Sequence, residues 1–224
     1  MKDPARSFSD THAKSYVEGP PRLVPGFDAL HRMMSMLLAE RTPPDARILV
    51  LGAGGGLELR TLAADHPGWR FDGVDPSTDM LAEVHQTAAP YMDRIALTQG
   101  TIEAAPEAAF DAATCLLTFH FIARENRLPT LREIRRRLKP GAPFVLAHIS
   151  FPQTEPERSL WIDRHIAWGG TFPGNIESAR EAISTRLTIL SPEEEEAMLT
   201  QAGFASVSLF YAGLSFKGWV GYAG

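Results

Sequence analysis

The sequence predicts an α/β fold, a doubly wound seven-stranded sheet that is mostly parallel and ends in an antiparallel C-terminal hairpin strand. Short unbroken apolar runs such as residues 48–51 are typical of strands buried on both faces of a parallel sheet. They alternate with helical segments, which implies right-handed crossovers and helices on both faces. The alternating stretches 207–211 and 214–222 flank a tight turn and predict a hairpin added at the sheet edge.

Length and composition favour a single large domain with accessory segments. The chain has 224 residues, of which 44% are hydrophobic and 22% are charged, the balance of an ordinary globular protein. No apolar run approaches the roughly 18 residues that cross a bilayer, and residues 1–10 lack the apolar core of a signal peptide. We therefore expect a cytoplasmic protein that has no membrane partner.

Cysteine content and charge narrow the function classes further. The one cysteine, Cys115, excludes an internal disulfide and a multi-cysteine zinc site, which agrees with a reducing compartment, and we expect no metal. The net charge of −5 gives no positive field that would draw the chain to nucleic acid or anionic lipid. These numbers favour a small-molecule substrate.

Residues 1–45 are predicted to form an N-terminal helical lid or cap, and residues 46–224 the ligand-binding domain. Apolar residues three or four apart predict one helix face, made of Phe27, Leu30, Met33, Met34, Leu37 and Leu38. Pro43 and Pro44 then end the helix. Tyr16, Phe27 and the methionines are lid candidates, and for most of them packing against the sheet is the stronger interpretation.

Strands and helices alternate from residue 47 onward. Strands are predicted at residues 48–51, 69–74, 95–98, 110–117 and 144–149, and helices at residues 57–64, 77–87 and 125–138. Ser77 is placed to cap its helix, and Ser191 with Glu194 forms a capping-box pattern.

Two segments carry further expectations. In the helix over residues 125–138, the arginines at 132 and 135–137 are expected mostly on the solvent side. Residues 151–176 follow the fifth strand with poor periodicity, so they predict an irregular lid insertion. Its lid candidates are Trp161, Trp168 and Phe172.

A glycine-rich turn and an aspartate predict the ligand class. Gly52, Gly54 and Gly56 follow a predicted strand and open a helix, where the backbone can approach a ligand closely. Asp75 ends the second strand about 20 residues later, where a carboxylate can accept hydrogen bonds from both ribose hydroxyls. The spacing departs from the dinucleotide fingerprint. The pair therefore predicts a nucleoside-bearing ligand, with a tight turn and a helix-capping carboxylate as the structural alternatives.

Four segments in order resemble the motifs of class I S-adenosylmethionine-dependent methyltransferases. They are residues 48–56, 73–81, 110–113 and 137–142. The resemblance implies a Rossmann-like fold, S-adenosyl-L-methionine as the cofactor, and transfer of its methyl group to a small organic acceptor. It also implies the cofactor-binding residues Gly52, Ala53 and Gly54 for the methionine part and ribose, Asp75 for the ribose hydroxyls, Pro76, Met80, Thr101 and Ile102 around the adenine, and Leu117 beside the sulfonium.

A narrower resemblance connects the chain to carboxy-S-adenosylmethionine synthases. Residues 22–27, 117–121 and 210–220 are similar to segments of that family. The resemblance implies that Arg180 grips the extra carboxylate of a modified cofactor, and it implies a homodimer. The chain departs from the family at Gly54 and Gly55, where those synthases tend to have a serine–arginine pair.

Several roles stay open at this point. His120 is a candidate general base, because imidazole titrates near neutral pH, and His148 is expected to point toward the cleft rim. For each, a hydrogen-bonded histidine without a catalytic part is the alternative. The apolar pair Leu116 and Leu117, at a place where catalytic polar groups are common, also leaves open a non-catalytic cofactor sensor or partner subunit.

Overall fold

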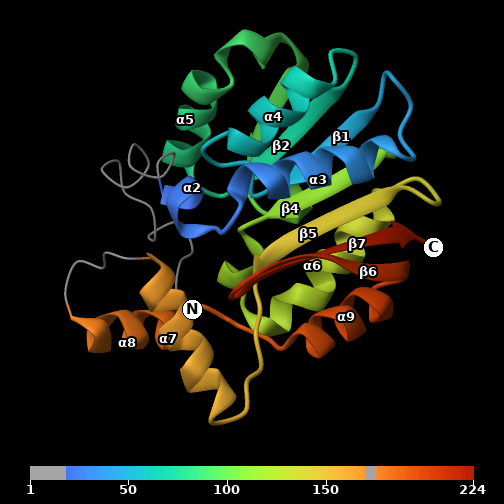
Figure 1. The fold of residues 1–224 in the computed structure, drawn as a ribbon. Helices are drawn as coiled ribbons and strands as arrows, with labels where there is room; N and C mark the ends of the chain where they lie inside the picture. The colour runs from blue at the N-terminus through green and yellow to red at the C-terminus, as the bar shows by residue number, and fades with distance from the viewer. Residues whose placement is uncertain (1–18, 170–174) are drawn as a thin grey trace.

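The computed structural model describes residues 19–169 and 175–224, which form a seven-stranded sheet in the order β3-β2-β1-β4-β5-β7-β6 (Figure 1). The strands are β1 Arg47–Leu51, β2 Arg70–Asp75, β3 Ile95–Gln99, β4 Ala112–Leu116, β5 Pro143–Ile149, β6 Phe204–Gly213 and β7 Phe216–Ala223. The first five pair in parallel, and β7 pairs antiparallel with both β5 and β6. The predicted fold class is confirmed.

The helices predicted at residues 57–64, 77–87 and 125–138 begin and end close to where the sequence places them. The helices of the described residues are α2 Gly19–Leu23, α3 Phe27–Ala39, α4 Leu57–Asp65, α5 Thr78–Thr87, α6 Arg124–Arg136, α7 Glu157–Gly169, α8 Ile176–Arg186 and α9 Pro192–Gln201. The Ser77 hydroxyl accepts the N–H of Met80, and Ser191 and Glu194 form both hydrogen bonds of a capping box. Both predicted caps are confirmed.

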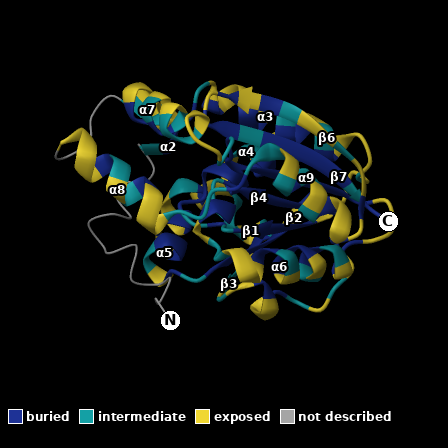
Figure 2. Cartoon of the chain, turned by 90° about the horizontal axis from the view of Figure 1, so that it is seen from below, coloured by how far each residue is buried: buried dark blue, intermediate teal, exposed yellow. Residues whose placement is uncertain are grey.

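Two apolar cores lie on opposite faces of the sheet, because successive strand side chains alternate (Figure 2). Ile48 and Val50 of β1 pack into the core that α3, α4 and α5 cover. Leu49 and Leu51 pack into the core of α6 and α9. A sheet buried on both faces explains why these strands read as unbroken apolar runs.

The predicted N-terminal helix packs on the sheet as part of the first core. Its buried residues include Leu30, Met34 and Leu38. The Tyr211 hydroxyl of β6 donates a 2.5 Å hydrogen bond to the Pro25 carbonyl, so the segment before α3 is tied to the hairpin. Tyr16 lies outside the described residues.

The segment after β5 differs from the sequence prediction. Residues 151–176 were expected to be irregular, but α7 occupies much of the segment and α8 follows it. Ile162 and Ile166 of α7 and Ile183 of α8 are buried in the first core. Burial of these isoleucines anchors one face of each helix to the core, although the apolar residues of the segment show only weak helical periodicity. Trp161 is partly buried and Trp168 is 49% exposed, while Phe172 lies outside the described residues.

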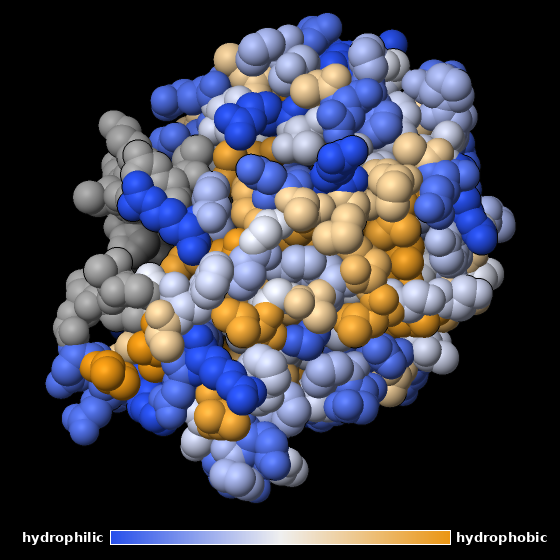
Figure 3. Space-filling model, viewed as in Figure 1, coloured by the Kyte–Doolittle hydropathy of each residue, from blue (hydrophilic) through white to orange (hydrophobic). Residues whose placement is uncertain are grey.

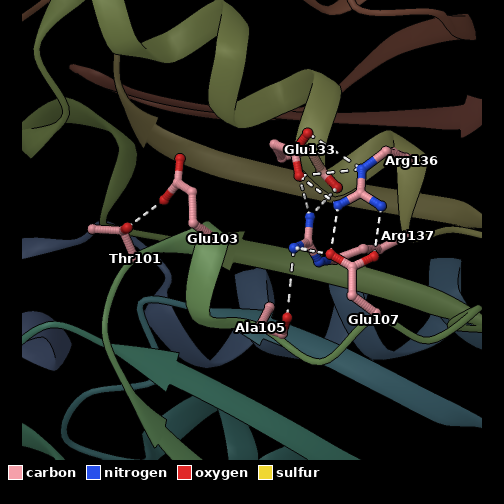
Figure 4. A network of polar contacts seen from close by, with 7 residues as sticks. All are labelled: Thr101, Glu103, Ala105, Glu107, Glu133, Arg136 and Arg137. Atoms are coloured by element: carbon pink, nitrogen blue, oxygen red, sulfur yellow. Dashed lines mark hydrogen bonds and ion pairs between the residues drawn. The ribbon is translucent and has the colours of Figure 1, made fainter.

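Arg132 and Arg136 are exposed as expected, but one arginine of this group departs from the expectation. Arg137 was expected mostly outside, yet its side chain is buried between Glu133 and Glu107 (Figure 4). Arg127, in the second turn of α6, is fully buried as well. Both arginines have carboxylate partners, which is the condition under which proteins bury such groups.

The surface is mixed in character. Figure 3 shows exposed apolar side chains interrupted by polar ones, and the large exposed apolar residues include Met36 on α3 and Leu209 on β6. Singly exposed apolar residues are ordinary for a folded chain. Of the helices that the structure describes, none combines the length and apolar character that a membrane crossing requires.

Candidate binding site at the carboxyl ends of the strands

The glycine turn lies where the strand order reverses. Strand β1 pairs with β2 on one side and with β4 on the other. From β1, the strands β2 and β3 are added outward on one side, and β4 and β5 are then added outward on the other side. The loop over residues 52–56 leaves β1 at this point. Ligands of doubly wound sheets bind beyond the carboxyl ends of the strands at such a switch point.

The N–H groups of the loop donate hydrogen bonds to other groups of the same chain. Those of Gly52 and Ala53 donate to the Val74 carbonyl, at 2.8 and 3.1 Å. Gly55 donates to the Met80 carbonyl, and Gly54 donates to Oδ2 of Asp75 at 3.0 Å. A phosphate cradle needs such groups to be free for the anion. The geometry therefore disfavours a pyrophosphate at this turn, in agreement with the spacing of its glycines.

At two of these glycines, close neighbours leave no room for a side chain. A Cβ on Gly54 would lie 2.7 Å from Oδ2 of Asp75 and from Cβ of Met80. Gly52 has φ +78°, and its Cβ would lie 2.0 Å from Oγ1 of Thr118. The loop can follow this path only because both residues lack side chains.

Asp75 is almost buried beside the loop, with 9% of its surface exposed. Burial raises its pKa, and the hydrogen bonds from Ser77 and Gly54 partly offset the rise. Oδ1 accepts from Ser77 N at 2.9 Å and Oδ2 from Gly54 N at 3.0 Å. A carboxylate has about four acceptor positions, so two backbone bonds leave capacity for two more donors.

A pocket with a cavity volume of about 30 Å³ opens beside the loop. It is lined by Pro20, Phe27, His31, Gly52, Ala53, Gly54, Leu57, Glu58, Leu116 and Leu117. This volume is well below that of small-molecule sites, so the lining must move apart to admit a ligand. The pocket unites the loop, the end of β4 and the N-terminal segment, so three separate parts of the sequence meet there.

Sequence reasoning missed the two ionisable residues of this pocket. Glu58 in the first turn of α4 looks like a carboxylate that favours the helix dipole, and His31 is a polar residue within an apolar helix pattern. Burial raises the pKa of Glu58 to about 8, a rise that the nearby Thr114 hydroxyl reduces. Burial lowers the pKa of His31, whose Nδ1 lies 3.0 Å from the Phe27 carbonyl oxygen.

Leu117 lies on the pocket wall in a strained conformation. Its φ is +55°, in the left-handed region that residues with a Cβ rarely adopt. Its N–H donates to the Ala147 carbonyl of β5 at 2.6 Å, which holds it in place. Strain of this kind tends to collect at functional sites.

The residues predicted around an adenine lie on the Asp75 side of the loop. Met80 touches Gly54, and Ile102 is buried against Val74 in the second core. Pro76 is partly exposed beside them. Thr101 is exposed and donates its hydroxyl hydrogen to Glu103 (Figure 4).

His120 lies away from the pocket, in a buried group with Arg127, His148 and Glu195 that we call the histidine cluster. The His120 and His148 rings stack with centroids 6.1 Å apart. Burial, then the facing His148 and Arg127, holds the pKa of His120 well below its usual range. The ring is therefore neutral and does not line the pocket.

The expectation for His148 is wrong. It was expected at the cleft rim, but its side chain is fully buried, with Nε2 3.4 Å from Oε1 of Glu195 on α9. Alternation along β5 turns His148 toward the second core, where its ring lies near Trp219.

Arg180 lies on α8, and its guanidinium forms an ion pair with Asp163 of α7. Both side chains are more than a third exposed. Arg180 is absent from the pocket lining, so the structure does not bring it together with the glycine loop.

Comparison with known proteins shows a similarity to methyltransferases. Residues 48–141 match a family described as a methyltransferase domain. A protein from Nostoc punctiforme that was solved as a candidate O-methyltransferase superposes with a TM-score of 0.67 at 17% identity, covering 95% of this chain and 59% of its own length. In fold and in this stretch of sequence, the chain is similar to S-adenosylmethionine-dependent methyltransferases.

Within that class, the sequence is similar to carboxy-S-adenosyl-L-methionine synthases. The synthase of Pseudomonas syringae pv. tomato is 29% identical over 224 residues, which cover 95% of this chain and 91% of the relative. The synthase of Pseudomonas aeruginosa is 27% identical over 221 residues, with coverages of 93% and 89%. The similarity therefore extends well beyond the methyltransferase domain.

Proposed function

We propose that the chain binds S-adenosyl-L-methionine across the glycine loop and transfers its methyl group to a small organic acceptor. The observation that carries the proposal is the hydrogen bond between Gly54 and Asp75 at the switch point, which joins the loop to a carboxylate with acceptor capacity to spare. The family match and the pocket beside the loop support the same assignment.

The residues present fit this cofactor. The pocket opens beside Gly52 and Gly54, at the end of the loop where the methionine part would lie, and Asp75 can accept both ribose hydroxyls. Met80 and Ile102 offer apolar contacts on the adenine side, while Thr101 offers a hydroxyl at the surface. When bound, the cofactor supplies a methyl group activated by its sulfonium.

The protein would promote the reaction by positioning the two reactants and by excluding water. Leu116 and Leu117 form an apolar wall that keeps water from the reacting centre. Holding two reactants in line can supply about 7–11 kcal/mol of the barrier reduction, so the reaction requires no side-chain nucleophile. The charge of −5 favours a small acceptor over nucleic acid. A role for His120 as the general base would require transfer through the histidine cluster, since its neutral ring lies outside the pocket.

Calorimetry with S-adenosylhomocysteine, the demethylated product, tests the proposal. We expect one site per chain, and we expect loss of binding affinity in Asp75→Ala. Absence of binding by both S-adenosylmethionine and S-adenosylhomocysteine to the folded protein would overturn it. The homodimer stays a prediction, which light scattering on the purified protein tests.

A second function, synthesis of a carboxylated cofactor, is favoured by the similarity to the two Pseudomonas synthases over 93% and 95% of this chain. In this alternative Arg180 would leave Asp163 and pair with the added carboxylate. Mass spectrometry of the ligand that remains bound through purification separates the two functions. A cofactor heavier by a carboxylate supports the second, and unmodified S-adenosylmethionine supports the first.

A further inference from the structure

Glu58 is the acidic residue of the pocket lining, and its position has no structural explanation. It is 7% exposed and lies in the first turn of α4. Its Oε1 is buried without a well-formed hydrogen bond, and so is Oγ1 of Thr114, which is close enough to lower the Glu58 pKa but too poorly aligned to satisfy either atom. A buried carboxyl oxygen without a partner costs stability, so a group that is present only in the complex would complete the site.

The place of Glu58 along the pocket indicates which group that is. Asp75 lies on the far side of Gly54 and is absent from the pocket lining, whereas Glu58 lines the pocket together with the loop and Leu117. This inference rests on the proposed function. If the ribose is held at Asp75, the pocket receives the opposite end of the ligand, its amino-acid part, which carries an ammonium and a carboxylate.

We propose that the Glu58 carboxyl group binds the ammonium of the cofactor's amino-acid part and releases its own proton to solvent as it does so. The ammonium keeps its hydrogens, and the carboxylate formed on Glu58 accepts one or more of them. Apart from His31, the other side chains of the pocket are apolar, so an ammonium there needs such a partner, because an unpaired buried charge is strongly unfavourable.

The groups that face Glu58 support this assignment. On α3, His31 has its Nδ1 against the Phe27 carbonyl oxygen, so this nitrogen carries the ring hydrogen and the other nitrogen is an acceptor. On β4, burial and the neighbouring Glu58 hold the pKa of Cys115 well above its usual range. Arg60 acts on the pKa of His31, and Arg127 acts on that of Cys115, but neither arginine contributes to the shift of the Glu58 pKa, which leaves the Glu58 carboxylate without a paired cation.

Proton release is the measurable consequence. Because the pKa of the buried carboxyl is about 8, about nine-tenths of the molecules carry the proton at pH 7 and lose it on binding. Burial lowers the pKa of His31 and raises that of Cys115, so both shifts lead away from the pH range of the experiment. The ligand ammonium has a free carboxylate on the same carbon, which holds its pKa above the ordinary α-amino value and favours the protonated form.

The test is calorimetry of the full chain at pH 7 in phosphate and in Tris, which differ widely in heat of ionisation. With S-adenosylhomocysteine we expect release of about 0.9 proton, and affinity that rises nearly tenfold per pH unit from pH 6.5 to 7.5. The comparison ligand is 5′-methylthioadenosine, which has the nucleoside but no amino-acid part. It should release no proton.

Two variants test whether Glu58 is the group that releases the proton. Glu58→Gln should abolish proton release, weaken S-adenosylhomocysteine roughly tenfold and leave 5′-methylthioadenosine unchanged. The matched control, Asp75→Asn, should weaken both ligands and keep the proton release. Binding of S-adenosylhomocysteine to the natural chain without proton release, or equal weakening of both ligands by Glu58→Gln, overturns the inference and leaves the proposed function standing. Failure of both ligands to bind the natural chain instead overturns the proposed function.

Discussion

Arg127 and Glu195 form an ion pair in which neither side chain has exposed surface. Nη1 of Arg127 donates to Oε1 of Glu195 at 2.5 Å, and the same arginine donates to the carbonyl of Thr188 and to that of Ile122 at 3.2 Å. The pair joins α6 to α9. It also fixes the chain before α9, so one side chain holds three segments together.

Removal of one partner of this pair should be strongly destabilising. Glu195→Gln leaves the Arg127 charge buried without its counter-ion, and we expect the free energy of unfolding to fall by about 3–5 kcal/mol at pH 7. Glu193→Gln, on the exposed side of the same helix, should change it by less than about 0.5 kcal/mol. Urea unfolding of both variants measures the difference. Equal small effects would show that the pair contributes nothing specific.

The same ion pair should make the stability of the protein fall at low pH. Burial alone would raise the pKa of Glu195, but His148 and Arg127 more than offset it and hold the pKa below the ordinary 4.5. Its contribution to stability is therefore complete above pH 4.5 and is lost as the pH falls through the lower, folded-state pKa. The stability gap between the natural chain and Glu195→Gln should stay constant from pH 7 to 5 and narrow below 4.5. A constant gap down to pH 2 would contradict this.

Glu58 should give the opposite pH dependence in the ligand-free protein. Its pKa rises from 4.5 to about 8 on folding, so its contribution is complete below pH 4.5 and is lost as the pH rises toward 8. Relative to Glu58→Gln, the natural chain should lose stability with rising pH, by up to about 1.4 kcal/mol per unit. Urea unfolding at pH 5, 6, 7 and 8 gives the slope. Parallel curves for the two proteins would mean that Glu58 is ionised in the folded state.

Alanine substitutions at two glycines distinguish the cost of backbone strain from the cost of a steric clash. Gly52 and Gly141 have similar φ values, +78° and +76°, but a Cβ would meet Thr118 at the first and open space at the second. Gly141→Ala should therefore cost only the left-handed conformation, about 1–2 kcal/mol, and retain binding of S-adenosylhomocysteine. Gly52→Ala should be more destabilised and lose that binding. Similar stability and binding in the two variants would show that the contact with Thr118 relaxes easily.

Arg180 distinguishes the two proposed reactions. If the chain makes a carboxylated cofactor, Arg180→Ala should be purified without it, whereas Arg186→Ala, on the exposed end of the same helix, should retain it. If the chain transfers methyl groups, neither substitution should change the mass of the bound ligand. Native mass spectrometry reads both results. Loss of the carboxylated ligand in both variants would indicate a general effect on α8.

The elements at the glycine loop were predictable because local patterns specify them. Ser77 and Ser191 cap helices through their own neighbours, and Gly52 and Asp75 occupy positions that a doubly wound sheet requires. For such residues, the few amino acids on either side hold most of the information.

The buried charges were not predictable for the complementary reason. Arg127 and Arg137 belong to a segment rich in arginine. Arg127 pairs with a carboxylate of α9, and Arg137 pairs with one in the loop before β4 in addition to its neighbour Glu133. Glu58 is the same case, since only the packed N-terminal helix turns its position into a pocket wall. Burial of a charge is decided by the tertiary partner, which a single sequence does not display.

The position of β7 inside the sheet governs the order in which the fold can be completed. Until residues 216–223 have left the ribosome, β5 presents an open edge and β6 has no strand to pair with. An open edge of this kind recruits strands from other chains. The nascent polypeptide is therefore most vulnerable to aggregation between the emergence of β5 and that of β7.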